Sequence, residues 1–114
     1  MEISKFVMSY DLHDSNVEKY TYLSQEHKVI LDIELCNWRQ RAFQKGQSEI
    51  TMKRLIFDDV EDVQIEPSNL EIKDFEILTV DTTMKNSKSL KMVLHDEGII
   101  IVMVIIAGRV YWEK

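Results

Sequence analysis

The chain has 114 residues, 45% of them hydrophobic and 30% charged, and its formal net charge is −6. This length and composition predict one globular domain over residues 1–114 and exclude a disordered chain. The acidic balance argues against nucleic-acid binding, which needs a basic face. The single Cys36 excludes an internal disulfide and favours a reducing compartment. The first residues do not form a basic segment followed by an apolar one, so we expect a cytoplasmic protein without a signal peptide.

The first residues of the chain predict an irregular start followed by a strand. Residues 1–10 are weakly apolar and fit either a short edge strand or a docked arm, and residues 11–16 are polar, as in a loop. The next stretch, 16–23, is typical of a strand. Simple alternation then gives two faces, with Val17, Thr21 and Leu23 on one and Tyr20 and Tyr22 on the other.

Residues 28–36 form the most regular alternation in the chain. One face carries only aliphatic side chains, and the other is mainly charged; the aliphatic ones are Val29, Leu31, Ile33 and Leu35. Such a strand has one dry and one wet face, as in an antiparallel sheet. Residues 37–49 then lose the period and are rich in basic residues. We interpret them as a loop or a single helical turn inserted between two strands.

The second half of the chain predicts shorter strands separated by polar turns. Strands are expected at residues 50–57, 63–65, 75–83 and 90–94. Polar turns or loops are expected at the acidic run 58–62 and at 66–69, 85–89 and 96–98.

An apolar run near the C-terminus is the strongest structural signal. The nine residues from Ile99 to Ala107 are all apolar, and seven of them are Ile or Val, whose branched side chains favour a strand. The run is too short to cross a membrane as a helix, which takes about 20 residues. A strand that is apolar on both faces is typically central and covered on both sides. Its neighbours in the fold, or a second chain, would provide that cover.

The sum of these elements is an all-β chain. About seven or eight short strands joined by polar turns predict an antiparallel sandwich or a partly open barrel, with one irregular insertion around 37–49.

No catalytic or metal-binding pattern is recognisable. The sequence His13-Asp14-Ser15 contains the residue types of a hydrolase triad, but adjacent side chains point in different directions and cannot form the relay. We interpret the triplet as a loop in which short polar side chains bond nearby backbone groups. The three histidines and Cys36 lack the spacing of a zinc site. We therefore expect no enzymatic activity, no cofactor and no metal.

Two groups of residues are candidates for binding a partner. The first is the acidic run, which is either a solvated turn or a docking patch for a basic protein; it consists of Asp58, Asp59, Glu61 and Asp62. The second is Trp38 with Arg39 and Arg41, since Trp and Arg are enriched at interface hot spots. A Trp at a strand end more often covers the core, so for Trp38 we favour packing over binding.

Four short phrases together carry a resemblance. They are Tyr10-Asp-Leu-His-Asp-Ser15, Ile33-Glu-Leu-Cys-Asn-Trp38, Leu55-Ile-Phe57 followed by the acidic run, and the C-terminal Val-Tyr-Trp. In this order the chain resembles a largely uncharacterised group of small bacterial proteins, some of which look like immunity proteins encoded beside polymorphic toxins. The resemblance implies a cytosolic, mostly β protein that binds and blocks one toxin. The positions that match the pattern are Asp11, His13, Asp14 and Trp38.

Three functional hypotheses follow. The first is a non-enzymatic binding protein of the immunity type, which blocks a basic protein toxin by stoichiometric occlusion and has no nucleic-acid or membrane partner. The second is an assembly module that forms a homodimer through its apolar strand. The third is a small-ligand binder with a pocket in the mouth of a β-barrel, near His13, Asp14 and His95.

Overall fold

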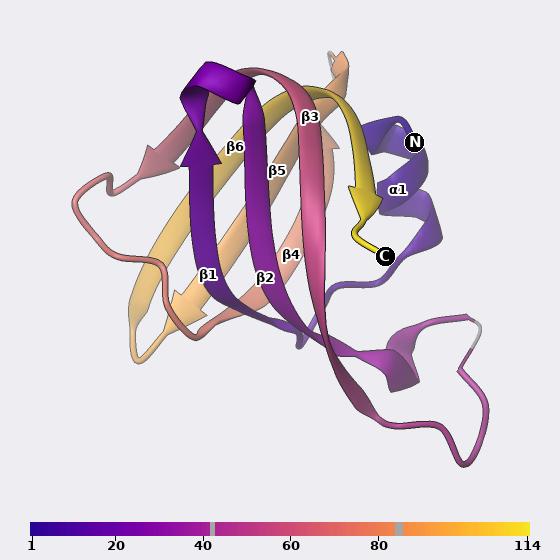
Figure 1. Cartoon of the computed structure of the whole chain (residues 1–114). Helices are drawn as coiled ribbons and strands as arrows, with labels where there is room; N and C mark the ends of the chain where they lie inside the picture. The colour runs from indigo at the N-terminus through magenta and orange to yellow at the C-terminus, as the bar shows by residue number, and fades with distance from the viewer. Residues whose placement is uncertain (42, 84–85) are drawn as a thin grey trace.

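The computed structural model describes residues 1–41, 43–83 and 86–114, which form a β-barrel and one short α-helix. Within these residues, six antiparallel strands close into a barrel in the order β1-β2-β3-β6-β5-β4 (Figure 1). The strands are β1 (Asn16–Leu23), β2 (Lys28–Cys36), β3 (Ile50–Glu66), β4 (Phe75–Thr83), β5 (Asn86–Asp96) and β6 (Ile99–Trp112). The helical segments are α1 (Ile3–Ser9) and the 3-10 turns η1 (Ser24–Glu26) and η2 (Asn37–Arg39).

The barrel consists of two three-stranded meanders that meet along two seams. Strands β1, β2 and β3 pair in chain order, and so do β4, β5 and β6. The wide seam joins β3 to β6, from Leu55 opposite Trp112 to Glu66 opposite Val102. The narrow seam joins β1 to β4, where only Asn16 and Val17 pair with Glu76 and Phe75. The predicted all-β antiparallel fold is therefore confirmed, as a closed barrel.

The number of strands is smaller than expected because β3 does not stop at the acidic run. The predicted turn at 58–62 is wrong, and the strands expected at 50–57 and 63–65 are two parts of one strand of 17 residues. β6 pairs with β3 on both sides of the run, so the strand continues. The register shifts between Val60 and Asp62, and Asp59 adopts a left-handed φ of 54°. A β-bulge of this kind bends a strand without ending it.

Strand β5 also extends beyond its predicted limits. It begins at Asn86, inside the loop expected at 85–89, and ends at Asp96. Lys85, the first residue of that expected loop, lies outside the described residues. The predicted turn between β5 and β6 is present, with left-handed φ angles of 46° at Glu97 and 83° at Gly98.

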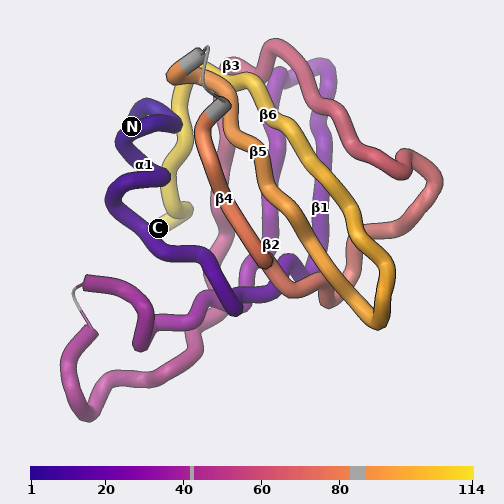
Figure 2. The backbone as a smooth tube through the Cα atoms, turned by 180° about the vertical axis from the view of Figure 1, so that it is seen from behind, coloured from indigo at the N-terminus to yellow at the C-terminus, as the bar shows by residue number. Residues whose placement is uncertain are grey.

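The N-terminal segment docks on the barrel as a helix and not as a strand. Ile3 and Phe6, three positions apart, both point into the core from α1. The ring of Phe6 packs against those of Tyr10 and Trp112 in tilted arrangements, with ring centroids 4.9 and 5.6 Å away. The backbone N–H of Val110 donates to the carbonyl of Met1 at 2.9 Å, which places both ends of the chain side by side (Figures 1 and 2). Within the described residues, no helix is long and apolar enough to cross a membrane.

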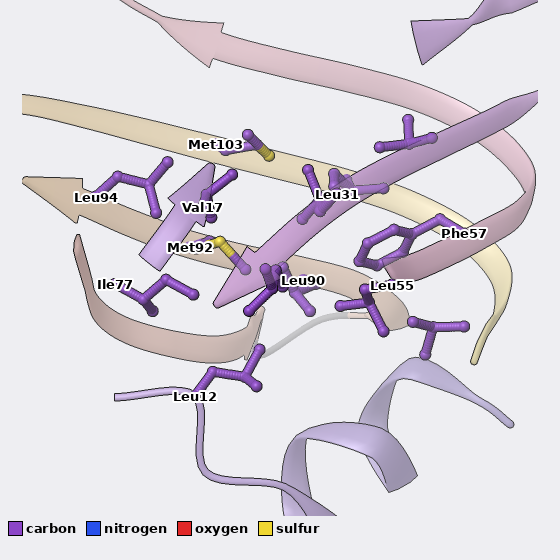
Figure 3. Packing of buried hydrophobic residues seen from close by; sticks show 14 of the residues in the cluster. Leu12, Val17, Leu31, Leu55, Phe57, Ile77, Leu90, Met92, Leu94 and Met103 are labelled. Atoms are coloured by element: carbon purple, nitrogen blue, oxygen red, sulfur yellow. The ribbon is translucent and has the colours of Figure 1, made fainter. Parts of the chain in front are cut away.

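The interior of the barrel is filled by inward-facing aliphatic side chains. On β2 these are the residues predicted by alternation, which are buried: Val29, Leu31, Ile33 and Leu35. On β6 every second residue from Ile101 to Ala107 is buried, and Figure 3 shows Met103 among side chains from the other strands. The outer face of β6 is different, since Ile100 is 50% exposed and Val102, Val104 and Ile106 are only partly buried. The expectation that β6 is covered on both sides is therefore wrong for its outer face.

Gly108 on β6 lies against the bulge of β3, and this contact predicts a coupled effect on stability. A Cβ at Gly108 would lie 3.0 Å from the Cβ of Asp59. We expect Gly108→Ala to lower the free energy of unfolding by about 1–3 kcal/mol, as overpacking does. Asp59→Gly removes the opposing Cβ, so the same substitution should cost less in that background. Urea denaturation of both single variants and the double variant measures this coupling; strictly additive effects would contradict it.

Candidate functional site

Two groups of residues that are distant in the sequence meet at one end of the barrel. Arg39 donates from its guanidinium to Asp11 at 3.2 Å and to Asp14 at 3.1 Å. The Nδ1 atom of His13 lies 3.0 Å from a carboxylate oxygen of Asp14. We call Asp11, His13, Asp14 and Arg39 the Arg39 cluster. Three of its members match the pattern of the resemblance, and the fourth comes from the basic insertion at 37–49.

The loop 11–15 is held in place from both sides by backbone and buried groups. The backbone N–H of Asp14 donates to the carbonyl of Ile77 on β4 at 3.1 Å. The hydroxyl of Ser15, which is fully buried, accepts from the N–H of Cys36 at 2.9 Å. The thiol of Cys36 donates to the carbonyl of Asp14 at 3.3 Å, and burial raises the pKa of that thiol. These bonds fix the backbone that carries Asp11, His13 and Asp14.

The insertion that carries Arg39 is fixed as well. The side chain of Gln40 bonds the backbone of Asp11 twice, accepting from its N–H at 3.0 Å and donating to its carbonyl at 2.6 Å. The backbone N–H of Asn37 donates to the carbonyl of Glu49 at 2.7 Å. The side-chain amide of Asn37 donates to the backbone carbonyl of Ser48 and to the hydroxyl of Thr51. The base of the insertion is therefore closed, and the predicted irregular segment begins with the 3-10 turn η2. Ala42, inside this segment, lies outside the described residues.

Trp38 is exposed, which corrects the expectation that it packs in the core. Its side chain is 49% exposed, and the guanidinium of Arg39 lies over its ring at 5.0 Å. This is a cation–π contact, which is worth about 0.5–1 kcal/mol at exposed sites. Because Arg39 is also bound by Asp11 and Asp14, the indole rests on a side chain that is itself fixed. The other tryptophan, Trp112, is partly buried and packs on Phe6.

A surface hollow of about 490 Å³ lies beside the Arg39 cluster. Its lining comes from α1, the loop 11–15, the insertion and β4, and includes Met8, Tyr10, His13, Arg41 and Val80. Met8 on α1 is 77% exposed. The hollow lies outside the filled interior of the barrel, and His95 does not line it. The nitrogen Nε2 of His95 instead accepts from the N–H of Gly98 at 3.4 Å.

The acidic residues lie at the other end of β2 and β3, away from the Arg39 cluster. The eight steps of β2 separate the two groups by about 26 Å at 3.3 Å per residue. Asp58 is only 13% exposed and pairs with Arg109 at 3.0 Å and Lys28 at 3.7 Å, so its charge is largely neutralised within the protein. Three carboxylates of the run remain exposed: Asp59, Glu61 and Asp62.

The described residues do not assemble a hydrolase triad or a metal cluster. Ser15 is buried and its hydroxyl accepts from the Cys36 N–H on β2, so it is not exposed to attack a substrate. In residues 1–41, 43–83 and 86–114, no three His, Cys, Asp or Glu side chains are arranged to hold a metal ion. The chemistry of the Arg39 cluster is ion pairing and hydrogen bonding between fixed groups.

The ion pairs of the cluster predict a pH dependence of stability. Partial desolvation alone would raise the pKa of Asp14, but the Arg39 hydrogen bond and the charges of His13 and Arg39 outweigh it. The pKa therefore lies below its ordinary value of 3.8. A depressed pKa stabilises the fold above the unfolded-state pKa, and this contribution is lost as pH falls through the folded-state pKa. We expect Asp14→Asn to be less stable than the native chain at pH 7, with the difference shrinking below about pH 4. Urea midpoints measured from pH 2 to 7 test this; a difference independent of pH would contradict it.

Some residues of this site could not be found by sequence reasoning. Gln40 and Met8 have no distinctive pattern around them, and their roles come from contacts that only the fold creates. The basic composition of 37–49 was a usable signal, and it drew attention to Arg39 and Arg41. Comparison of the chain with protein-family models, curated proteins and solved structures finds no significant match.

Proposed function

We propose that this protein is a non-enzymatic binding protein that occludes a partner protein through the end of the barrel that carries Trp38. We call this the loop-end surface and define it by Met8, His13, Trp38, Arg39 and Arg41. The observation that carries the proposal is the exposed Trp38 stacked on an Arg39 that two carboxylates hold in place.

An exposed tryptophan on a fixed support is well suited to act as a binding anchor. Trp and Arg are the residue types most enriched among interface hot spots. Ordering a side chain on binding costs about 0.5–1.5 kcal/mol, so a preordered pair loses less entropy. The hollow beside the Arg39 cluster offers a complementary recess for a side chain of the partner. These features support recognition of a protein surface.

The charge distribution supports a particular kind of partner. Segment 37–49 carries three basic residues and one acidic residue, in a chain whose net charge is −6. The overall charge attracts a basic protein over long distances, and the exposed Asp59, Glu61 and Asp62 contribute to that field. At the loop-end surface itself, the exposed Arg41 favours a partner carboxylate. The partner we infer is a basic protein with an acidic or aromatic contact region.

The resemblance described above supports a bacterial toxin as that partner. An immunity protein acts by staying bound, so its protection depends on the amount of protein and not on turnover. The test is to express the chain together with the toxin candidate encoded by the neighbouring gene and to titrate the two inductions. Rescue of growth that begins at equal amounts, with a one-to-one complex on purification, is the expected result. A neighbour that is not toxic, or rescue at strongly substoichiometric amounts of this chain, would overturn the proposal.

A further inference from the structure

A second surface, independent of the loop-end surface, lies on the outer face of β6. The side chains that alternate with the buried ones on this strand are all apolar and point outward: Ile100, Val102, Val104 and Ile106. Val93 on β5, opposite Val102, points the same way. We call these five residues the outer apolar stripe. In Figure 2 this part of β6 faces the viewer, between β5 and the C-terminal part of β3.

The outer apolar stripe differs from the outer face of β2. The outward residues of β2 include Lys28, Asp32 and Glu34, as expected for a face in water. Ile100 is 50% exposed, and the branched residues beyond it are partly exposed. A contiguous apolar patch on a soluble domain is typical of an interaction surface.

Charged residues of opposite sign flank the stripe. On the β3 side, Asp62 lies opposite Ile106 and Glu66 lies opposite Val102. On the β5 side, Lys91 lies opposite Val104, level with the midpoint between the two carboxylates. Lys91 forms no ion pair within residues 1–41, 43–83 and 86–114. The stripe therefore has two carboxylates on one flank and one lysine on the other. Asp81 of β4 lies opposite Lys91 on the side away from the stripe, but these two described side chains form no ion pair with each other.

We propose that the outer apolar stripe binds a second copy of this chain in a symmetric dimer. A two-fold axis parallel to β6 lays one stripe face to face on the other. It places β3 of each copy over β5 of the other copy. Each Lys91 then faces the gap between Asp62 and Glu66 of the other copy, twice in the dimer. A two-fold axis perpendicular to β6, in the plane of the sheet, would instead place β3 over β3, so that Asp62 and Glu66 of one copy would face the same carboxylates of the other. The charges thus select one self-complementary arrangement, as an isologous interface requires.

Sedimentation velocity of the native chain over a range of concentrations tests the dimer. A stripe on one strand and its neighbours is a small interface, so we expect a dissociation constant in the micromolar range, on the order of 10–100 µM. Val104→Asp places a charge at the centre of the stripe and should abolish the dimer. Ile50→Asp is the matched control, because Ile50 is as exposed as Ile100 but lies on β3, outside the stripe. A native chain that stays monomeric at about 1 mM overturns the proposal.

A charge-swap experiment tests the arrangement itself. Lys91→Glu alone, and Asp62→Lys with Glu66→Lys in another chain, should each weaken the homodimer at least about tenfold through like-charge contacts. In a mixture of the two variants, every flank meets its opposite, so the mixed dimer should form. Circular dichroism confirms that each variant is folded, which these exposed positions allow. Failure of the mixture to dimerise while the native chain does would reject the parallel axis, and with it this inference.

Discussion

Replacing Phe57 by alanine is expected to lower the free energy of unfolding by about 3–5 kcal/mol. Phe57 is one of the largest fully buried side chains, and it lies on β3 between Val29 of β2 and Val110 of β6. Figure 3 shows its ring beside Leu55 and near Leu31. In a closed barrel the strands cannot collapse freely into the vacated space, so the cavity persists. The loss of transfer energy and the cavity then add.

The effect of Phe57→Ala can be separated from a general effect on β3. Met52→Ala removes a flexible apolar side chain from the same strand, but Met52 is exposed on the outer face. Surface substitutions of this kind change stability by at most about 0.5 kcal/mol. Urea unfolding followed by circular dichroism should therefore separate the two variants clearly. Equal losses would mean that the interior of the barrel is not packed as described.

Trp38→Ala is expected to weaken the proposed complex by about 30-fold or more while leaving the barrel stable. This corresponds to about 2 kcal/mol, the threshold at which an interface residue counts as a hot spot. Trp38 has no core contact to lose, because its side chain is exposed and rests on Arg39. Isothermal titration with the partner recovered by the co-expression test gives the affinity, and a thermal melt gives the stability.

A matched control places the effect at the loop-end surface. Tyr22→Ala removes another exposed aromatic side chain, but Tyr22 lies beside η1 at the far end of β1. We expect its affinity for the partner to be unchanged. A Trp38→Ala variant that binds as tightly as the native chain would remove the loop-end surface from the proposed interface. A variant that loses stability as well would show that Trp38 packs more firmly than its exposure indicates.

The limits of three strands could be predicted from the sequence, but the irregularities inside them could not. β1, β2 and β4 have the predicted bounds. Within β1, however, the register shifts between Val17 and Lys19, so Val17 lies on the inner side with Tyr20 and not with Thr21. Bulges of this kind leave no pattern in a single sequence, because the extra residue only breaks the alternation. The run at 58–62 was predicted as a turn because of its clustered acidic residues, yet β3 continues through it with a bulge.

The candidate site was only partly predictable because it depends on closing the barrel. The types of residue that mattered were recognisable, and Asp11, His13, Asp14, Trp38 and Arg39 were all singled out. That Arg39 joins Asp11 and Asp14 follows from the fold, which brings the end of β2 next to the loop before β1. The exposure of Trp38 likewise depends on the fold, in which its ring lies on Arg39 and not against the core.

The unequal seams of the barrel determine where it opens. The β3–β6 seam is long and lies at the centre of the sheet, whereas β1 and β4 are joined only between residues 14–17 and 75–77. Amide hydrogens of β1 and β4 beyond that seam should exchange with deuterium faster than those of β3 and β6, because local opening there breaks few bonds. The sheet can thus unroll from this edge while the two meanders stay joined. Because the loop 11–15 belongs to this seam, unrolling also releases the backbone that anchors Arg39. Local opening of the β1–β4 seam should therefore also loosen the loop-end surface, because the same hydrogen bonds hold both.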